Sequence, residues 1–129
     1  MRLRRFPILT DRKGSVLVET AIALPLLILV MSGIIDFGYQ FAVSNSMQSV
    51  SNETARLVAI RRLTAAEAPA YAQGRLMKAL GPYSVTASVS GSDAVINITI
   101  PRRDAALIDV LGIFRTGNLA ARSTMRLIS

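Results

Sequence analysis

The feature that most constrains this chain is an apolar block, Ser15 to Ile35, in which Glu19 is the single charged residue. A helix of this length rises about 31 Å, at about 1.5 Å per residue, and a bilayer has a hydrocarbon core of about 30 Å. The block therefore predicts a helix that crosses a membrane. We expect the transmembrane helix to cover residues 15–38 and a separate domain to cover residues 39–129.

The segment before the block, residues 1–14, is short and basic and is expected to be a leader peptide. It holds five of the 15 basic residues and one of the 8 acidic ones, so four of the seven net positive charges lie here. Basic residues directly before an apolar span keep that end of the chain in the cytoplasm. We therefore expect a single-pass membrane protein with a cytoplasmic N-terminus and a C-terminal domain on the other side of the membrane.

A cleaved secretory signal is the alternative interpretation of this N-terminus, because a basic segment followed by an apolar one is also typical of signal peptides. The apolar block is long for such a signal, and no Ala-x-Ala-like cleavage site follows it. These two observations favour a retained membrane anchor.

The composition excludes several kinds of chemistry. The sequence has no His and no Cys, which removes the usual zinc sites, thiol catalysis, Ser-His triads and disulfides. It also lacks a Gly-rich phosphate loop and a Gly-x-Ser-x-Gly motif. We expect no enzymatic activity, cofactor, metal or small-molecule substrate. The net charge of +7 suggests a nucleic-acid binder as one hypothesis. Most of this excess charge lies in the leader, however, so we expect no nucleic-acid binding.

Two residues inside the apolar block need an explanation. A carboxylate in hydrocarbon is costly unless it is paired, so Glu19 is either a functional residue or an interfacial residue that reaches the cytoplasmic surface. Pro25 lacks a backbone N–H and predicts a helix kink, for which an incidental bend and a functional one are both open.

The spacing around Glu19 resembles the substrates of type IV prepilin peptidases, in which a short basic leader ends in Gly and the fifth residue of the mature chain is Glu. Here Gly14 ends the leader and Glu19 is the fifth residue after it. The longer stretch resembles the TadE-like family, minor pseudopilins of tight-adherence (Flp) type IV pilus systems. The residues that carry this resemblance are Gly14, Val18, Glu19, Ala21, Ala23, Leu24, Pro25, Leu27, Gly33, Asp36, Phe37 and Gly38. Thr20 departs from the aromatic residue common after the Glu.

The resemblance implies a non-enzymatic role in pilus assembly, with cleavage between Gly14 and Ser15 and a recognition and assembly role for Glu19. The implied partners are a prepilin peptidase, other pilins or pseudopilins, the pilus assembly platform and the membrane. The resemblance also implies that this membrane is the bacterial inner membrane and that the C-terminal domain is periplasmic. A generic signal-anchored periplasmic binding or scaffold protein is the alternative function.

Beyond the block, helical spacing of apolar residues predicts one long helix from about residue 15 to 62, with Glu53 and Arg56 as an exposed pair. A short second helix is expected to end at Leu80. Its start is ambiguous, because Thr64 and Glu67 fit a capping box whereas Pro69 fits a first-turn proline.

The apolar period then changes from 3.6 to 2, which predicts strands over 83–90, 95–100 and 119–127 with a three-residue hairpin loop over 91–93. Asp104 is expected to cap a short helix with Leu107, Ile108, Leu111 and Phe114 on one side. Two pairs of arginines, Arg102 with Arg103 and Arg122 with Arg126, fit a solvated face, or a basic patch against the membrane surface or an acidic partner. The sequence thus predicts an α+β, pilin-like fold, in which three antiparallel strands pack on the amphipathic half of the long helix.

Overall fold

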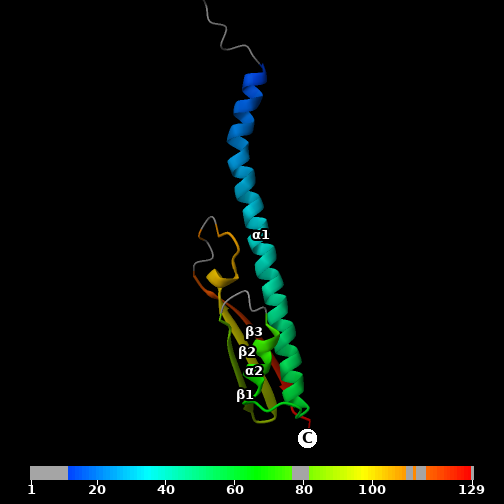
Figure 1. The fold of residues 1–129 in the computed structure, drawn as a ribbon. Helices are drawn as coiled ribbons and strands as arrows, with labels where there is room; N and C mark the ends of the chain where they lie inside the picture. Colours follow the sequence, from blue (N-terminus) through cyan, green and yellow to red (C-terminus); the bar gives the residue numbers. More distant parts are fainter. Residues whose placement is uncertain (1–11, 77–81, 110–111, 113–115, 129) are drawn as a thin grey trace, which may run out of the picture.

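The computed structural model describes residues 12–76, 82–109, 112 and 116–128. Its elements are the helices α1 (Arg12–Ala59) and α2 (Ala68–Arg75), the strands β1 (Ser84–Ser90), β2 (Asp93–Pro101) and β3 (Asn118–Arg126), and the 3-10 helix η2 (Arg102–Ala105). The fold is α+β, as the sequence predicts, with one long helix that extends well beyond the rest of the molecule (Figure 1).

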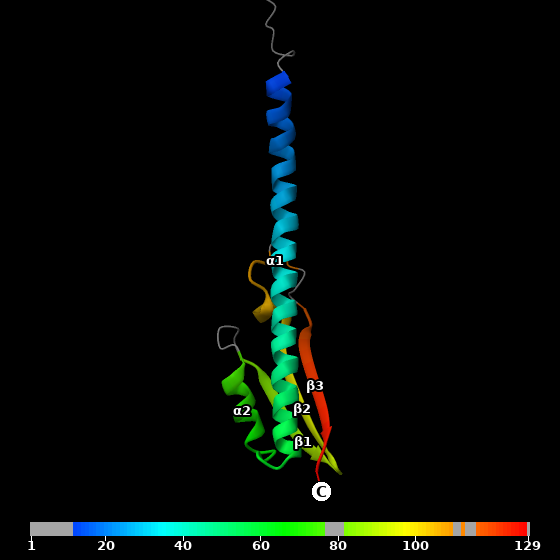
Figure 2. The same ribbon diagram turned by 90° about the vertical axis from the view of Figure 1, so that its right-hand side faces the viewer.

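The helix α1 divides into two parts by what surrounds it. From Gly14 to Met31 no residue is buried; we call this part the stalk. From Ser32 onward its side chains become buried at regular intervals against the sheet and α2, and we call this part, together with those elements and η2, the head. The helix continues without interruption through Pro25, so the two parts belong to one rod (Figures 1 and 2).

The three strands form one antiparallel sheet in the order β1-β2-β3. Helix α1 lies over β2 and β3, and α2 lies over β1, so both helices cover the same face (Figure 2). The side chains of Ile96, Ile98 and Ile100 point into this layer and are fully buried, in one cluster with Val43 and Met47 of α1. The predicted packing of the sheet on the amphipathic half of the long helix is therefore confirmed.

The hairpin between β1 and β2 is one residue tighter than predicted. Ser90 pairs with Asp93, which leaves Gly91 and Ser92 as a two-residue loop. Gly91 has a φ of +61°, and two-residue hairpins need positive φ in their turn because this matches the twist of the flanking strands. The alternation predicted for β1 fails only at Val89, next to this turn, where the side chain is exposed.

The two start signals predicted for the second helix occur together. The Glu67 carboxylate accepts hydrogen bonds from the backbone N–H (3.0 Å) and the hydroxyl (2.7 Å) of Thr64, and the Glu67 N–H donates to the Thr64 hydroxyl at 3.3 Å. These bonds close a turn just before α2, while Pro69 lies in the first turn of the helix itself. The capping box and the proline therefore serve consecutive turns and do not compete.

The predicted end of the second helix and the predicted helix after Asp104 are wrong. Helix α2 ends at Arg75 rather than Leu80, because Leu76 adopts an extended backbone that places its side chain in the core, and Gly74 weakens the last turn. Met77–Gly81 lie outside the described residues. Asp104 does not cap a helix over Leu107 and Ile108. It lies inside η2, 3.6 Å from Arg103, and the residues after Ala105 are not helical. Leu111 and Phe114 lie outside the described residues.

Candidate functional site

The four residues predicted to serve in processing, in assembly or as a helix kink all lie on the stalk. Gly14 and Ser15 are in the first turns of α1, Glu19 is one turn further along, and Pro25 lies near the middle of the stalk. Of the stalk residues only Leu29 is even half-buried. The stalk thus presents its apolar side chains outward, and α1 is long and apolar enough to span a membrane.

Glu19 lies beside a shallow groove along the stalk. The groove is lined by Glu19, Thr20, Ala23, Leu24, Leu26, Leu27 and Val30. Apart from Glu19 and Thr20 every lining side chain is apolar, and Thr20 and Ala23 are small enough to leave the helix surface open. The carboxylate therefore stands at the polar end of an apolar strip that nothing in the described part of the chain covers.

Two other polar side chains near the groove, Thr20 and Ser32, are satisfied within the helix. The Thr20 hydroxyl donates to the carbonyl of Val16 at 2.8 Å, and the Ser32 hydroxyl donates to the carbonyl of Ile28 at 2.8 Å. Such bonds to the preceding turn remove the cost of a hydroxyl in an apolar medium. Glu19 differs, because none of the side chains that the structure describes forms an ion pair or hydrogen bond with it.

The fold of this chain does not itself require glycine at position 14. A Cβ added there would meet no atom within 4 Å, and the residue has no positive φ. Glycine also weakens a helix by roughly 0.5–1 kcal/mol relative to alanine. The described residues therefore give no steric reason for glycine at this position.

Asp36 has a structural role that the sequence did not reveal. Its side chain is buried, and its carboxylate accepts hydrogen bonds from the backbone N–H groups of Leu107 (3.0 Å), Ile108 (2.9 Å) and Asp109 (2.8 Å). These bonds occupy the donors that a helix over 104–114 would use, which explains why the predicted helix is absent from the described residues there. The only signal in the sequence was an acidic residue directly after an apolar block.

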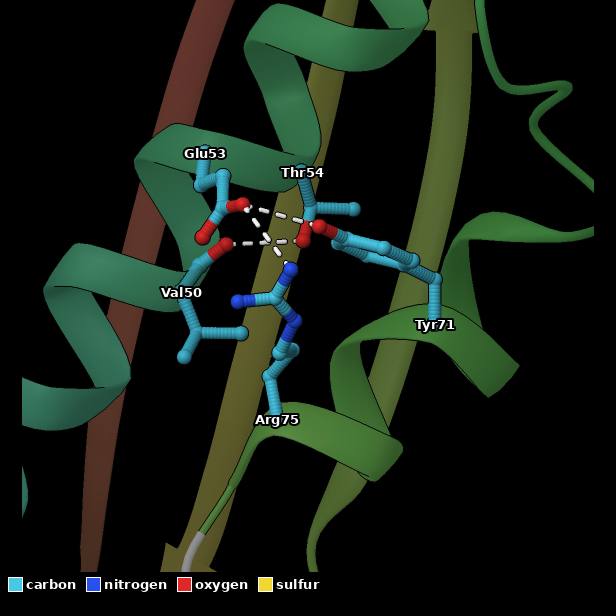
Figure 3. A network of polar contacts seen from close by, with 5 residues as sticks. All are labelled: Val50, Glu53, Thr54, Tyr71 and Arg75. Atoms are coloured by element: carbon cyan, nitrogen blue, oxygen red, sulfur yellow. Dashed lines mark hydrogen bonds and ion pairs between the residues drawn. The ribbon is translucent and has the colours of Figure 1, made fainter.

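Glu53 also has partners other than the predicted one. It does not pair with Arg56; instead the Tyr71 hydroxyl donates to Glu53 Oε1 at 2.8 Å, and Arg75 lies 3.6 Å from the same oxygen (Figure 3). The hydrogen bond to Glu53 is the main cause that raises the pKa of Tyr71. The Arg75 guanidinium also lies 5.3 Å from the centre of the Tyr71 ring. Since these contacts join α1 to α2, the cluster explains the packing of α2 and suggests no catalytic centre.

Within the described residues, no three acidic side chains lie close enough together to hold a metal ion. What the geometry does define is a class of protein: a single apolar helix that could cross a membrane, carrying a small α+β head at one end.

A family comparison narrows this class. Residues 14–56 match the model of the TadE-like protein family, which confirms the resemblance drawn from the sequence and connects the chain with Tad pilus systems. The match begins at Gly14 and ends three residues before the end of α1, so it covers about a third of the chain and none of the sheet. The comparisons with curated proteins and with solved structures found no match.

Proposed function

We propose that this protein is a minor pseudopilin that takes part in the assembly of a tight-adherence (Flp) type IV pilus and has no enzymatic activity. The observation that carries the proposal is the TadE-like match, which begins at Gly14 and runs along a stalk that the described residues leave uncovered. An apolar helix without intramolecular partners needs lipid or other helices around it. In this proposal the helix is surrounded by lipid at first, and by neighbouring pilins or pseudopilins after assembly.

The first step of the proposed role is removal of the leader by a prepilin peptidase, through hydrolysis of the peptide bond between Gly14 and Ser15. The protein would sit in the bacterial inner membrane with residues 1–14 in the cytoplasm and the head in the periplasm. The open space around Gly14 supports this step, because the fold does not require glycine there. A peptidase that must approach the backbone closely would explain why the residue is glycine.

The second step uses Glu19. Cleavage leaves a new α-amine on Ser15, and the Glu19 carboxylate of one subunit would pair with that amine on a neighbour. Each charge alone is costly in an apolar medium, so their pairing is favourable chiefly because it removes two such costs together. The groove beside Glu19 would receive the neighbouring helix, and the ion pair would set the axial register between the two. The assembly platform and other pilins are the partners in this step.

Glu19→Ala tests the proposal in cells that need this protein for piliation. We expect normal membrane insertion and normal processing, but loss of pilus assembly or of recruitment to the assembly complex. Glu19→Asp, one methylene shorter, should be partly impaired. Thr20→Ala is the matched control, because Thr20 lines the same groove while its hydroxyl is satisfied by Val16. Normal assembly by processed Glu19→Ala protein would make Glu19 a merely interfacial residue.

A generic signal-anchored scaffold is the competing function, since a membrane helix with a small head also suits that role. The two differ in processing: a scaffold keeps its leader, or loses the whole apolar block to an ordinary signal peptidase. Replacing Gly14 with a bulky residue should therefore leave an uncut, membrane-anchored precursor in the pseudopilin case and change nothing in the scaffold case.

A further inference from the structure

The loop that follows η2 presents two large aliphatic side chains to the outside of the head. Leu107 is 59% exposed and Ile108 is 48% exposed. Exposed aliphatic side chains that stand next to each other at a loop are unfavourable in water and mark an interaction surface when they continue a larger apolar area. The apolar surface that borders Leu107 and Ile108 therefore decides what they contact.

Their position along the molecule is fixed by Asp36. The three hydrogen bonds from the backbone of Leu107, Ile108 and Asp109 hold the loop against α1 at this residue. Asp36 directly follows the apolar block that ends at Ile35. The loop therefore lies at the level where the apolar block ends, on the side of the head from which the stalk projects (Figure 1).

The surface of α1 at the same level is also apolar and exposed. It contributes Ile34, Ile35, Phe37 and Phe41. Together with the loop these residues form an apolar collar, defined here as Ile34, Ile35, Phe37, Phe41, Leu107 and Ile108, that is continuous with the stalk. Arg102 and Arg103 are exposed in η2, which leads into the loop, and Arg103 also lies 3.6 Å from the Asp104 carboxylate. Apolar side chains next to exposed cationic ones fit the boundary between lipid headgroups and acyl chains.

We infer that the loop over residues 106–109 is a second membrane contact of this protein: Leu107 and Ile108 enter the surface of the bilayer that the stalk crosses, and Arg102 and Arg103 face the phosphates of its lipids. The inference rests on membrane insertion of the stalk, which is part of the proposed function. A lipid surface is the occupant because the collar is continuous with the lipid-facing stalk and lies next to Arg102 and Arg103, whose charges complement anionic headgroups. A single helix leaves the head free to rotate about the helix axis, and this second contact fixes its orientation on the membrane.

The sequence contains no Trp, so a single introduced Trp reports on one position. The full chain is reconstituted into phosphatidylcholine–phosphatidylglycerol vesicles, with and without lipids brominated on the acyl chains, and quenching of the Trp fluorescence is measured. Leu107→Trp probes the loop, and Leu27→Trp probes the stalk. Ile128→Trp is the matched control, because Ile128 is an equally exposed aliphatic residue (63%) at the opposite end of the head.

We expect several-fold stronger quenching for Leu107→Trp than for Ile128→Trp, together with a blue-shifted emission. In the Leu107→Trp background, Arg102→Gln with Arg103→Gln should lower the quenching in anionic vesicles to the level found in purely phosphatidylcholine vesicles. No effect of this double change would overturn the role of the two arginines.

If Leu27→Trp is quenched while Leu107→Trp behaves like Ile128→Trp, the second contact is wrong and membrane insertion stands. An unquenched Leu27→Trp overturns insertion, and with it both the proposed function and this inference. A blue shift of Leu107→Trp without quenching, present only at high protein-to-lipid ratios, would assign the collar to a second copy of the chain and overturn the lipid contact.

Discussion

The stalk and the head are parts of one helix-based molecule that depend on different surroundings. In the head, α1 buries Val43 and Met47 against the isoleucines of β2, so the chain supplies its own apolar environment. The side chains of the stalk, such as Leu26 and Leu27, are as a group more apolar than those of α1 in the head, yet none of them is buried. The head therefore has an apolar core formed by its own chain, whereas the described residues leave the apolar side chains of the stalk uncovered.

The largest effect expected from this comparison is on the free energy of unfolding of the head. Ile98→Ala removes a fully buried side chain at the centre of the sheet and should destabilise the head by about 2–5 kcal/mol. Leu27→Ala in the stalk should change it by less than about 0.5 kcal/mol, because Leu27 has no contact with the core. Urea unfolding of the full chain in detergent micelles, followed by the strand signal in circular dichroism, measures both. Equal effects would remove the distinction between stalk and head.

A smaller effect is expected at the junction of the two parts. Asp36→Ala leaves three backbone N–H groups without their charged acceptor and should destabilise the loop by about 1–3 kcal/mol. Asp36→Asn is the matched variant, since it keeps one acceptor oxygen for two of the three donors. Amide hydrogen exchange should rise at residues 107–109 in the order wild type, Asn, Ala, with β2 unaffected. Unchanged exchange at these amides would show that Asp36 does not hold the loop.

The smallest effect concerns pH. Hydrogen bonds from the Thr64 hydroxyl and backbone N–H lower the pKa of Glu67 below its usual value of 4.5. The unfolded chain therefore takes up this proton at higher pH than the folded one, so the stabilisation is present above pH 4.5 and is lost as the pH falls through the lowered folded pKa. Thermal unfolding of the head should show this loss, and Glu67→Gln should remove it.

The sequence predicted those parts of the fold that depend on periodicity and local chemistry. The long helix, the three strands and the capping box at Thr64 and Glu67 all follow from patterns that span a few residues. The segment after Pro101 was predicted wrongly because its backbone is held by Asp36, some 70 residues earlier in the chain. Likewise Glu53 pairs with Tyr71 and Arg75 and not with Arg56, since α2 folds back beside it.

For the candidate site, too, only those residues could be predicted that are marked by local sequence features. Gly14, Glu19 and Pro25 could be selected from sequence because their spacing and the apolar block around them are local features. The structure adds that Glu19 stands beside an uncovered groove and that the hydroxyls of Thr20 and Ser32 are satisfied within the helix. The roles of Glu19 and of the Gly14–Ser15 bond depend on other molecules, so they stay predictions that a single chain does not test.

The central claim is that the stalk begins a mature pseudopilin, and the N-terminal residue of the mature protein tests it most directly. Intact mass measurement and N-terminal sequencing of the protein purified from membranes should show Ser15 as the first residue, with the apolar block retained. A chain that still begins at residue 1, or one that begins anywhere beyond Ile35, would contradict cleavage between Gly14 and Ser15 and with it the pseudopilin account.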